Sequence, residues 1–224
     1  MCGRIVRTSP AEALAAQLGA VVAEGVRLRP RWNLCPGEDL VIVVQAGLER
    51  RLGTVRWGFV PGFARSADDG PRSINARAES VATRPAFRDA FRRRRCVVLA
   101  DAFYEWKREG RAKQPFLVRL RTGRPMVLAG LWERWRPPEG PPLRTGLVIT
   151  CPAGGRMAEI HDRMPVILQP DAVDRWLDPA CPDPAALLTP LPESLLEIYP
   201  VSERVNSPRN DDPALLDRVD PPTA

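Results

Sequence analysis

Cys2 is the residue whose position most clearly suggests chemistry. It follows Met1, and a small side chain at the second position permits removal of the initiator methionine. The freed residue carries an α-amine and a thiol, that is, a 1,2-aminothiol. The amine titrates at about pH 7.7–8.0 and can attack an aldehyde to give a Schiff base, and the thiol, with a reference pKa of about 8.5, can then close on the imine to form a thiazolidine. The alternative is that Cys2 is a small residue at a terminus without function.

Glu105 lies among aromatic residues in the string Phe103-Tyr104-Glu105-Trp106. Alternation along a strand places Glu105 on the face opposite Tyr104 and Trp106. Partial desolvation there would raise the pKa of the carboxyl and suit it to general acid–base catalysis. An exposed glutamate on an amphipathic strand is an equally open alternative.

Two further polar motifs could serve a site. His161 is the only histidine, and it lies where helix signals give way to a strand, so that both a structural role and proton transfer are open. The string Asn75-Ala76-Arg77-Ala78-Glu79 places Asn75, Arg77 and Glu79 on one side if it is extended. Such a polar row needs partners, either from a neighbouring segment or from a ligand.

Basic and aromatic segments offer contacts for a nucleic acid. The run 92–95 contains four arginines, which suit either phosphate contacts or a solvated helix end. The loop 57–63 contains glycine and proline and can present Phe63 for base stacking, worth about 1–3 kcal/mol per base. Trp57 and Phe59 could equally belong to the core.

Composition limits the class of protein. The chain has 224 residues, of which 44% are hydrophobic, and 33 Lys+Arg against 27 Asp+Glu give a net charge of +6. We therefore expect one large domain with a preference for polyanions. Five widely spaced cysteines without a C-x-x-C pair argue against a disulfide framework and a thiolate zinc site, and we expect neither metal nor cofactor. No membrane span or secretory signal is recognisable, so we expect a cytoplasmic protein.

The elements that must position these residues are mostly short strands. Ser9 as N-cap, Pro10 at the first helical position and Glu12 predict a helix start with a capping box. Leu14 and Leu18 share a face of that helix, and Gly19 can end it. Strands 40–44 and 52–57 form a hairpin around the turn at 47–49. Further strands are expected at 96–100, 103–107, 115–120, 126–131, 147–151 and 165–168, and short helices at 85–93 and 170–177.

The pattern favours an α+β, mainly β fold, with a curled antiparallel sheet or barrel and short peripheral helices. A solvated, flexible tail is expected from about Pro213 to Ala224.

Seven strings, taken in order, resemble the SRAP family, the SOS response-associated peptidases or abasic-site processing proteins. They are Cys2-Gly3-Arg4, Trp57-Gly58-Phe59-Val60-Pro61, Asn75-Ala76-Arg77-Ala78-Glu79, Arg95-Cys96, Phe103-Tyr104-Glu105-Trp106, Ala129-Gly130-Leu131-Trp132 and His161-Asp162-Arg163-Met164-Pro165. The similarity continues through Val205-Asn206-Ser207-Pro208 to about Asp212, which bounds a single SRAP domain at residues 1–212. Phe63, Ala102 and Gly154 stand where the family commonly has tryptophan, glycine and asparagine.

The resemblance implies an enzyme that crosslinks covalently to abasic sites in single-stranded DNA, with a positively charged groove leading to the N-terminal cysteine. It also implies autoproteolytic exposure of that cysteine. We expect the protein to be a monomer. By position, Cys2 is the nucleophile, Asn75 holds it, Glu105 is the acid–base group for opening the sugar ring, and His161 assists proton transfer. The resemblance further implies that Arg4 and Arg77 are a phosphate-binding pair. We also expect the aromatic residues Trp57, Phe63 and Trp106 to contact the DNA.

Two other functions remain open. In an N-terminal-nucleophile peptidase, the Cys2 thiol would attack a peptide carbonyl with its own amine or His161 as the base. A non-catalytic module that binds single strands would need only the net charge and the aromatic residues.

Overall fold

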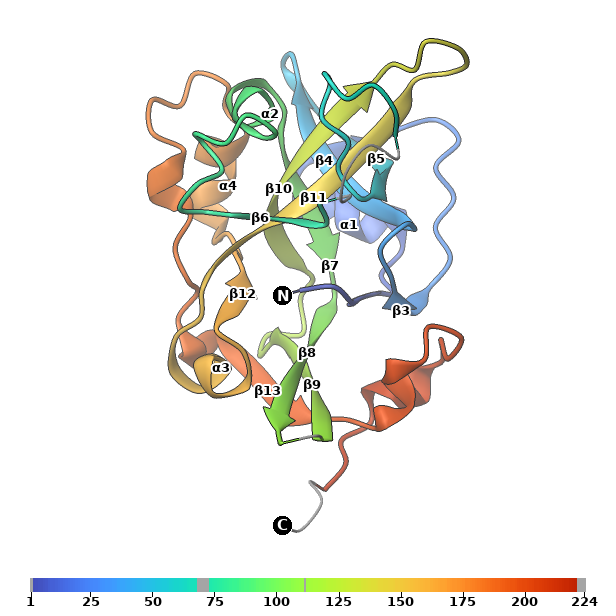
Figure 1. Cartoon of the computed structure of the whole chain (residues 1–224), viewed down its shortest axis with the longest axis vertical. Coiled ribbons are helices and arrows are strands. Elements are labelled where there is room, and N and C mark those ends of the chain that lie inside the picture. Colours follow the sequence, from blue (N-terminus) through green and yellow to red (C-terminus); the bar gives the residue numbers. More distant parts are fainter. Residues whose placement is uncertain (1, 68–72, 111, 221–224) are drawn as a thin grey trace.

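A computed structural model describes residues 2–67, 73–110 and 112–220. Short strands predominate, arranged in two curled sheets with short helices at the periphery (Figure 1). The mainly β, α+β architecture predicted from the strand pattern is confirmed. Within the described residues, none of the helices combines the length and the apolar character needed to cross a bilayer.

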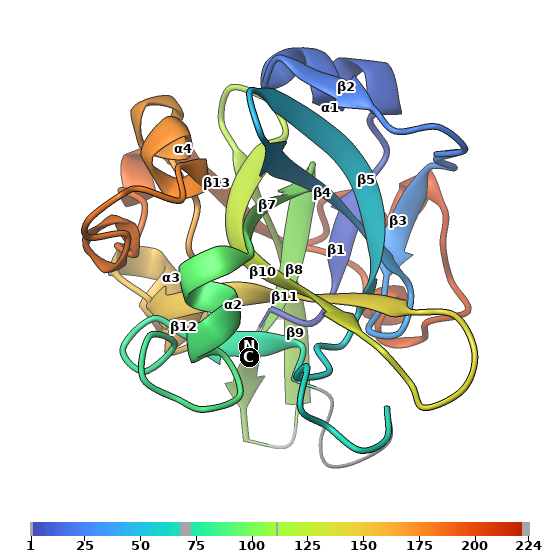
Figure 2. The same ribbon diagram turned by 90° about the horizontal axis from the view of Figure 1, so that it is seen from above.

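The larger sheet closes on itself. It contains β2 (Ala20–Val22), β4 (Asp39–Ala46), β5 (Glu49–Trp57), β6 (Asn75–Arg77), β7 (Arg95–Ala100), β10 (Met126–Trp135), β11 (Leu143–Pro152) and β12 (Arg163–Pro165). The strand order is β12-β11-β10-β7-β4-β5-β2, and a parallel β5–β11 pairing joins the ring (Figure 2). Every residue of β7 is buried, as expected for a strand covered on both faces.

The smaller sheet separates two hydrophobic clusters. It contains, in spatial order, β13 (Leu196–Pro200), β9 (Ala112–Leu120), β8 (Ala102–Glu109), β1 (Ile5–Arg7) and β3 (Arg31–Leu34), and all its pairings are antiparallel. Ile5 and Phe103 belong to the main core, whereas Val6 and Tyr104 belong to the smaller cluster. This alternation places Glu105 on the same face as Phe103.

Short helices pack against both sheets. They are α1 (Ala11–Gln17), α2 (Arg88–Arg93), α3 (Gly155–Ile160) and α4 (Pro170–Leu177), with 3-10 turns η1 (Ala185–Leu187), η2 (Glu193–Leu195), η3 (Glu203–Asn206) and η4 (Pro213–Leu216). Predicted helix 170–177 is confirmed, whereas predicted helix 85–93 begins three residues later, at Arg88.

The arginine run 92–95 divides between the surface and the core. Arg92 and Arg93 are exposed, whereas Arg94 forms an ion pair with Glu133. Arg95 is buried and donates hydrogen bonds to the backbone carbonyls of Phe91, Trp176 and Asp178. Two of the four arginines therefore stabilise the fold by joining α2 and α4 to the larger sheet.

The prediction that Ser9 is the N-cap of the first helix is wrong. The N-cap of α1 is Pro10, and no side chain caps the helix. The Ser9 hydroxyl instead donates to the Asp101 carboxylate, which also accepts from the Ser9 backbone N–H at 2.9 Å. Leu14 and Leu18 are buried on one face as expected. The β4–β5 hairpin is also confirmed, and its turn residue Gly47 adopts a φ of 65°.

The expectation of a solvated tail from Pro213 is wrong for the residues that the structure describes. Leu215 in η4 is buried in the smaller cluster, and Val219 N–H donates to the carbonyl of Pro200 at 3.1 Å. This segment packs because it supplies the apolar side chain of Leu215 to the smaller cluster. Residues 221–224 lie outside the described part of the chain.

Candidate active site

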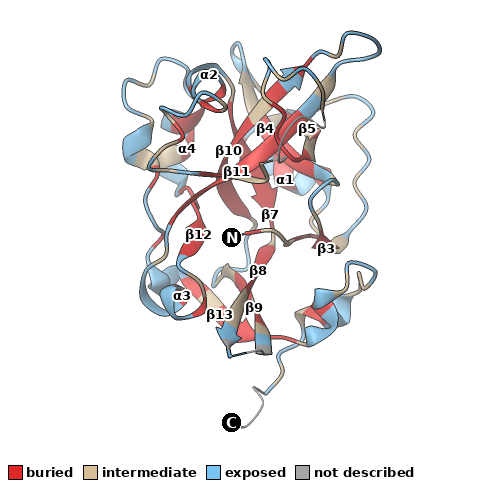
Figure 3. Cartoon of the chain, in the orientation of Figure 1, coloured by how far each residue is buried: buried red, intermediate tan, exposed pale blue. Residues whose placement is uncertain are grey.

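The N-terminal segment crosses the middle of the molecule, between the two sheets (Figures 1 and 3). Cys2 is only 1% exposed, and its carbonyl accepts a hydrogen bond of 2.8 Å from the Asn75 side-chain Nδ2. Asn75 begins β6, which pairs in parallel with β11 through Val148. The other amide atom, Asn75 Oδ1, is buried and has no hydrogen-bond partner among the described residues. Asn75 therefore fixes Cys2 and keeps one acceptor available beside it.

Glu105 is a buried carboxyl group on β8. It is 2% exposed and lies on the face of β8 opposite Tyr104, as predicted from alternation. Burial raises the pKa of Glu105 above its ordinary value. The predicted desolvation is therefore confirmed, and a carboxyl with a raised pKa can both donate and accept a proton nearer neutral pH.

His161 faces this carboxyl from the opposite side of the site. It follows α3 directly, and its Nε2 lies 3.8 Å from Glu105 Oε1. Its Nδ1 is 2.9 Å from the backbone nitrogen of Arg163, which donates to it. In the neutral imidazole this bond assigns the proton to Nε2, the atom that faces Glu105. The exposed Asp162 carboxylate also lies 2.9 Å from Nδ1 and would pair with a protonated ring.

Arg163 is held rigidly, which also fixes the backbone beside His161. Its guanidinium makes a two-pronged contact with the Glu79 carboxylate and donates to the carbonyl of Thr150 at 2.6 Å. Its hydrogen bonds lower the pKa of Glu79 and raise that of Arg163. Glu79 therefore finds its partner within the protein, whereas the sequence left a ligand equally open. The string containing His161 included Arg163, but only the fold reveals this clamp.

The pKa of the Cys2 thiol is raised above its ordinary value. Burial is the main cause, and the negative charge of Glu105 is the second. The thiol is therefore protonated at neutral pH, and Glu105 lies close enough to act on it electrostatically.

A polar cleft of about 760 Å³ opens beside this group. Its lining residues are Arg4, Glu105, Trp106, Arg108, Lys113, Glu159, Ile160, His161, Asp162 and Asn206. Three of them are cationic (Arg4, Arg108 and Lys113) and three are carboxylic (Glu105, Glu159 and Asp162), so the cleft offers both donors for a phosphate and groups for proton transfer. The cleft therefore brings the predicted residues Arg4, Trp106, Glu105 and His161 to one place.

Arg4 and Trp106 both donate to the C-terminal segment, and the acceptor of the Trp106 indole N–H is Asn206 Oδ1 at 2.7 Å. Arg4 donates to the side chain of Asn33 and to the carbonyl of Val205, both at 2.7 Å, and its guanidinium lies 6.0 Å from the centre of the Trp106 ring. Asn33 is fully buried, and sequence reasoning did not identify it. The signal was weak because one asparagine in a short strand has no local pattern.

The remaining predicted DNA contacts divide into surface and core. Arg77 is exposed at the end of β6, and Phe63 is 69% exposed. Trp57 is 1% exposed, and its indole N–H donates to the carbonyl of Ile74 at 3.0 Å. The prediction that Trp57 contacts bases is therefore wrong, and the alternative that Trp57 and Phe59 belong to the core is confirmed.

Comparison with known sequences gives the family. A sequence model of the SOS response associated peptidase (SRAP) family matches residues 1–208. This chain belongs to the SRAP family. Abasic site processing protein YoqW of Bacillus subtilis (strain 168) is 38% identical over 223 residues, which cover 97% of this chain and 99% of YoqW.

More distant similarities extend the comparison. Abasic site processing protein YedK of Escherichia coli (strain K12) is 29% identical to this SRAP chain, with 98% of this chain and 100% of YedK covered. A crystal structure of a Bacteroides thetaiotaomicron protein superposes with a TM-score of 0.88 at 24% identity, covering 97% of this chain and 100% of that one. The similarity to this crystal structure confirms the SRAP-type fold.

Proposed function

We propose that the protein processes abasic sites in single-stranded DNA by forming a covalent thiazolidine crosslink through Cys2 after removal of Met1. The crosslink would shield the damaged strand from breakage. The observation that carries this proposal is the convergence of Cys2, Asn75, Glu105 and His161 beside a polar cleft. Relatives named abasic site processing proteins support the choice of substrate.

The first chemical step exposes the aldehyde of the abasic sugar. Ring opening breaks the C1′–O4′ bond, removes a proton from the C1′ hydroxyl and delivers one to O4′. Glu105 is suited to both transfers because burial raises its pKa. His161, at 3.8 Å, can exchange a proton with it.

The crosslink then forms in two steps. The neutral α-amine of Cys2 attacks the aldehyde carbon, a C–N bond forms, and the carbonyl oxygen leaves as water, giving the imine. The Cys2 sulfur adds to the imine carbon, and the thiol proton ends on nitrogen. Asn75 donates to the Cys2 carbonyl, and its unpartnered Oδ1 is available to accept from the freed amine.

The protonation state of the thiol favours this order over peptidase chemistry. Because burial raises the pKa of the Cys2 thiol, little thiolate is present to attack a peptide carbonyl. The amine does not depend on that ionisation, so it can attack first. The thiol is needed only once an imine has formed.

The test combines intact mass measurement with denaturing electrophoresis. Purified protein is incubated with single-stranded DNA that contains one abasic site. We expect protein without Met1 to gain the mass of the DNA less one water, as a band that resists denaturants. Cys2→Ala should lose the band, whereas Cys181→Ala, a matched change at a half-buried cysteine outside the cleft, should keep it. A band of equal intensity from Cys2→Ala would refute the proposal.

The same samples separate the other functions. Turnover of peptides in trans without an adduct would favour the N-terminal-nucleophile peptidase. Equal affinity for intact and abasic strands would favour a simple binding module, in which the logarithm of the binding constant falls with the logarithm of the salt concentration by about 0.7 per phosphate neutralised.

The mass of the Cys2→Ala variant also shows how Met1, which lies outside the described residues, is removed. Retention of Met1 only in that variant would indicate autoproteolysis, because alanine also permits ordinary methionine removal.

A further inference from the structure

A second cleft is lined by arginines that the proposed Cys2 chemistry does not use. Its volume is about 710 Å³, and it shares no lining residue with the cleft beside Glu105. The cationic residues that line it are Arg7, Arg27, Arg29, Arg31 and Arg144, against the carboxylates of Glu24, Glu38 and Asp39. Its charge balance therefore favours an anion.

Arg7 is the unusual member of this cleft. Its side chain is buried, with the residue only 5% exposed, and its Nε and Nη1 have no hydrogen-bond partner among the described residues. Buried guanidinium groups are normally paired, because desolvating an uncompensated charge is costly. Arg7 therefore borders the cleft and carries buried donors that the described protein does not satisfy.

The strand register explains how Arg7 comes to be buried without a partner. Ile5 pairs with Leu34, but the register shifts before Arg7, which pairs with Arg31. Like charges at directly opposite positions repel. Ile5 and Val6 are buried in the two clusters, so β1 cannot rotate to release Arg7.

The carboxylate of Asp101, whose charge acts on Arg7, is already engaged in hydrogen bonds. Asp101 accepts hydrogen bonds from the backbone and hydroxyl groups of Thr8 and Ser9. Its charge acts favourably on Arg7 from a distance, but burial is the larger effect and lowers the pKa of Arg7. Asp101 therefore offsets only part of the cost of the buried cation.

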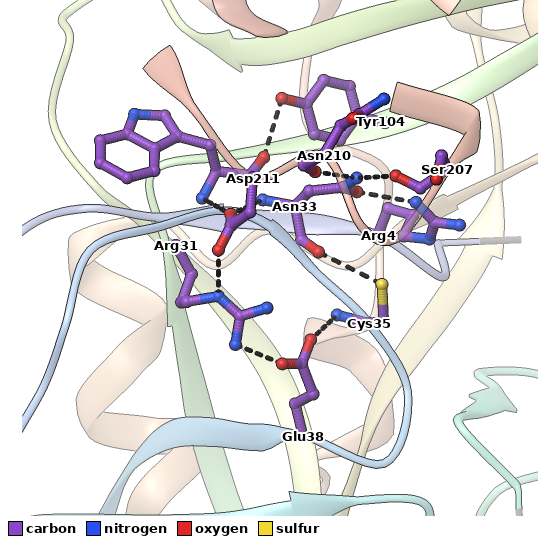
Figure 4. A network of polar contacts seen from close by, with 10 residues as sticks. Arg4, Arg31, Asn33, Cys35, Glu38, Tyr104, Ser207, Asn210 and Asp211 are labelled. Atoms are coloured by element: carbon purple, nitrogen blue, oxygen red, sulfur yellow. Dashed lines mark hydrogen bonds and ion pairs between the residues drawn. The ribbon is translucent and has the colours of Figure 1, made fainter. Parts of the chain in front are cut away.

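The carboxylates of Glu38 and Asp211 are paired with Arg31. As Figure 4 shows, Arg31 lies between Glu38 and Asp211 and forms an ion pair with each. Asp211 also accepts from the backbone nitrogens of Trp32 and Asn33. Arg31 is thus neutralised within the protein, whereas Arg7, directly opposite it, is not.

We propose that the Arg7 cleft is a second anion-binding site, which takes a phosphate group. A guanidinium can present two parallel N–H donors to a phosphate, and such charge-assisted hydrogen bonds are the strong ones. The exposed side chains of Arg27, Arg29 and Arg144 add positive charge around the bound group. A free phosphate and the phosphodiester of a nucleic-acid strand share this chemistry.

The test is a titration with inorganic phosphate at constant ionic strength, with chloride as the reference anion. The midpoint of thermal unfolding of the wild-type protein should rise with phosphate and not with chloride. Arg7→Met should weaken the phosphate affinity at least about tenfold, the effect of losing one hydrogen bond to a charged group. Arg92→Met, which removes an exposed arginine of α2 outside the cleft, should respond as wild type does.

Two results would overturn the proposal: a wild-type protein that responds equally to both anions, and equal phosphate responses in the two methionine variants. If Arg7→Met does not fold, Arg29→Gln with Arg144→Gln replaces it, and unchanged phosphate affinity in that double variant also refutes the site.

Binding to intact single-stranded DNA then distinguishes a free phosphate from the phosphodiester of a strand. Weaker DNA binding by the variant supports a strand phosphodiester, and unchanged DNA binding with weakened phosphate binding supports a free phosphate. Neither ligand contains an aldehyde, so the result is independent of the crosslinking reaction.

Discussion

Replacing Glu105 with glutamine tests the acid–base role while keeping the shape of the side chain. Glu105 is 2% exposed, so the site has little room for water to take over its function. Glutamine preserves the volume but cannot donate and accept a proton in turn. We therefore expect ring opening and imine formation to slow, while the packing of β8 is retained.

The expected magnitude follows from the geometry. Loss of a positioned acid–base group costs about 10²–10⁴-fold in rate, which corresponds to about 2.7–5.5 kcal/mol in the barrier. His161 Nε2 lies only 3.8 Å from Glu105 Oε1 and can substitute in part. We therefore expect a decrease of about 10²-fold for Glu105→Gln, and a larger one when His161→Ala is added.

The assay follows adduct formation on single-stranded DNA with one abasic site, sampled over time and resolved on denaturing gels. Affinity for the same strand without the lesion is measured in parallel and should change less than about threefold. A Glu105→Gln rate within about threefold of wild type would refute the assignment, provided that Cys2→Ala still abolishes the adduct.

The stability of this variant has a pH dependence with a definite sign. The pKa of Glu105 in the folded protein lies above the unfolded value, so between these two values the native state binds more protons than the unfolded state. The free energy of unfolding of the wild type therefore falls as pH rises through that window. Glutamine does not titrate, so the variant should gain stability relative to wild type as pH rises, by about 1.4 kcal/mol for each tenfold change in the dissociation constant of Glu105.

Three further predictions concern stability and binding. Phe63→Ala should change the free energy of unfolding by less than about 0.5 kcal/mol but weaken single-strand binding by about 1–3 kcal/mol, whereas Trp57→Ala should cost about 3–5 kcal/mol in chemical denaturation. Glu79→Gln should cost about 1 kcal/mol near neutral pH, and because Arg163 lowers the pKa of Glu79, this difference should begin to shrink below pH 4.5 and be lost as pH falls through the lowered pKa of the folded state. Arg95→Met should cost about 3 kcal/mol, since two buried carbonyls and one partly buried carbonyl lose a donor; equal unfolding midpoints for this variant and wild type would contradict that account.

The sequence by itself determined what depends on neighbours along the chain. The pleat of a strand repeats every two residues, so the string 103–106 was enough to place Glu105 opposite Tyr104. The run of β-branched residues and the following glycine fixed the β4–β5 hairpin. The chemistry available to Cys2 is likewise local, because it depends only on its position after Met1.

Tertiary structure alone decided which of the available partners each side chain takes. Ser9 had the right type and position for a helix cap, but Asp101, 92 residues away, took its hydroxyl. Trp57 resembled a loop aromatic, yet the parallel pairing of β5 with β11 buried it in the ring. Such outcomes depend on contacts between distant segments, which no local pattern records.

The candidate site is itself a product of those distant contacts. Cys2 precedes β1, Asn75 begins β6, Glu105 lies on β8 and His161 follows α3, so four separate segments supply it. The pairing of β1 with β8 and of β6 with β11 brings them together. Residue types determined which reactions were possible, and strand pairing determined which groups meet, because proton transfer and imine formation require contact in space and not proximity along the chain.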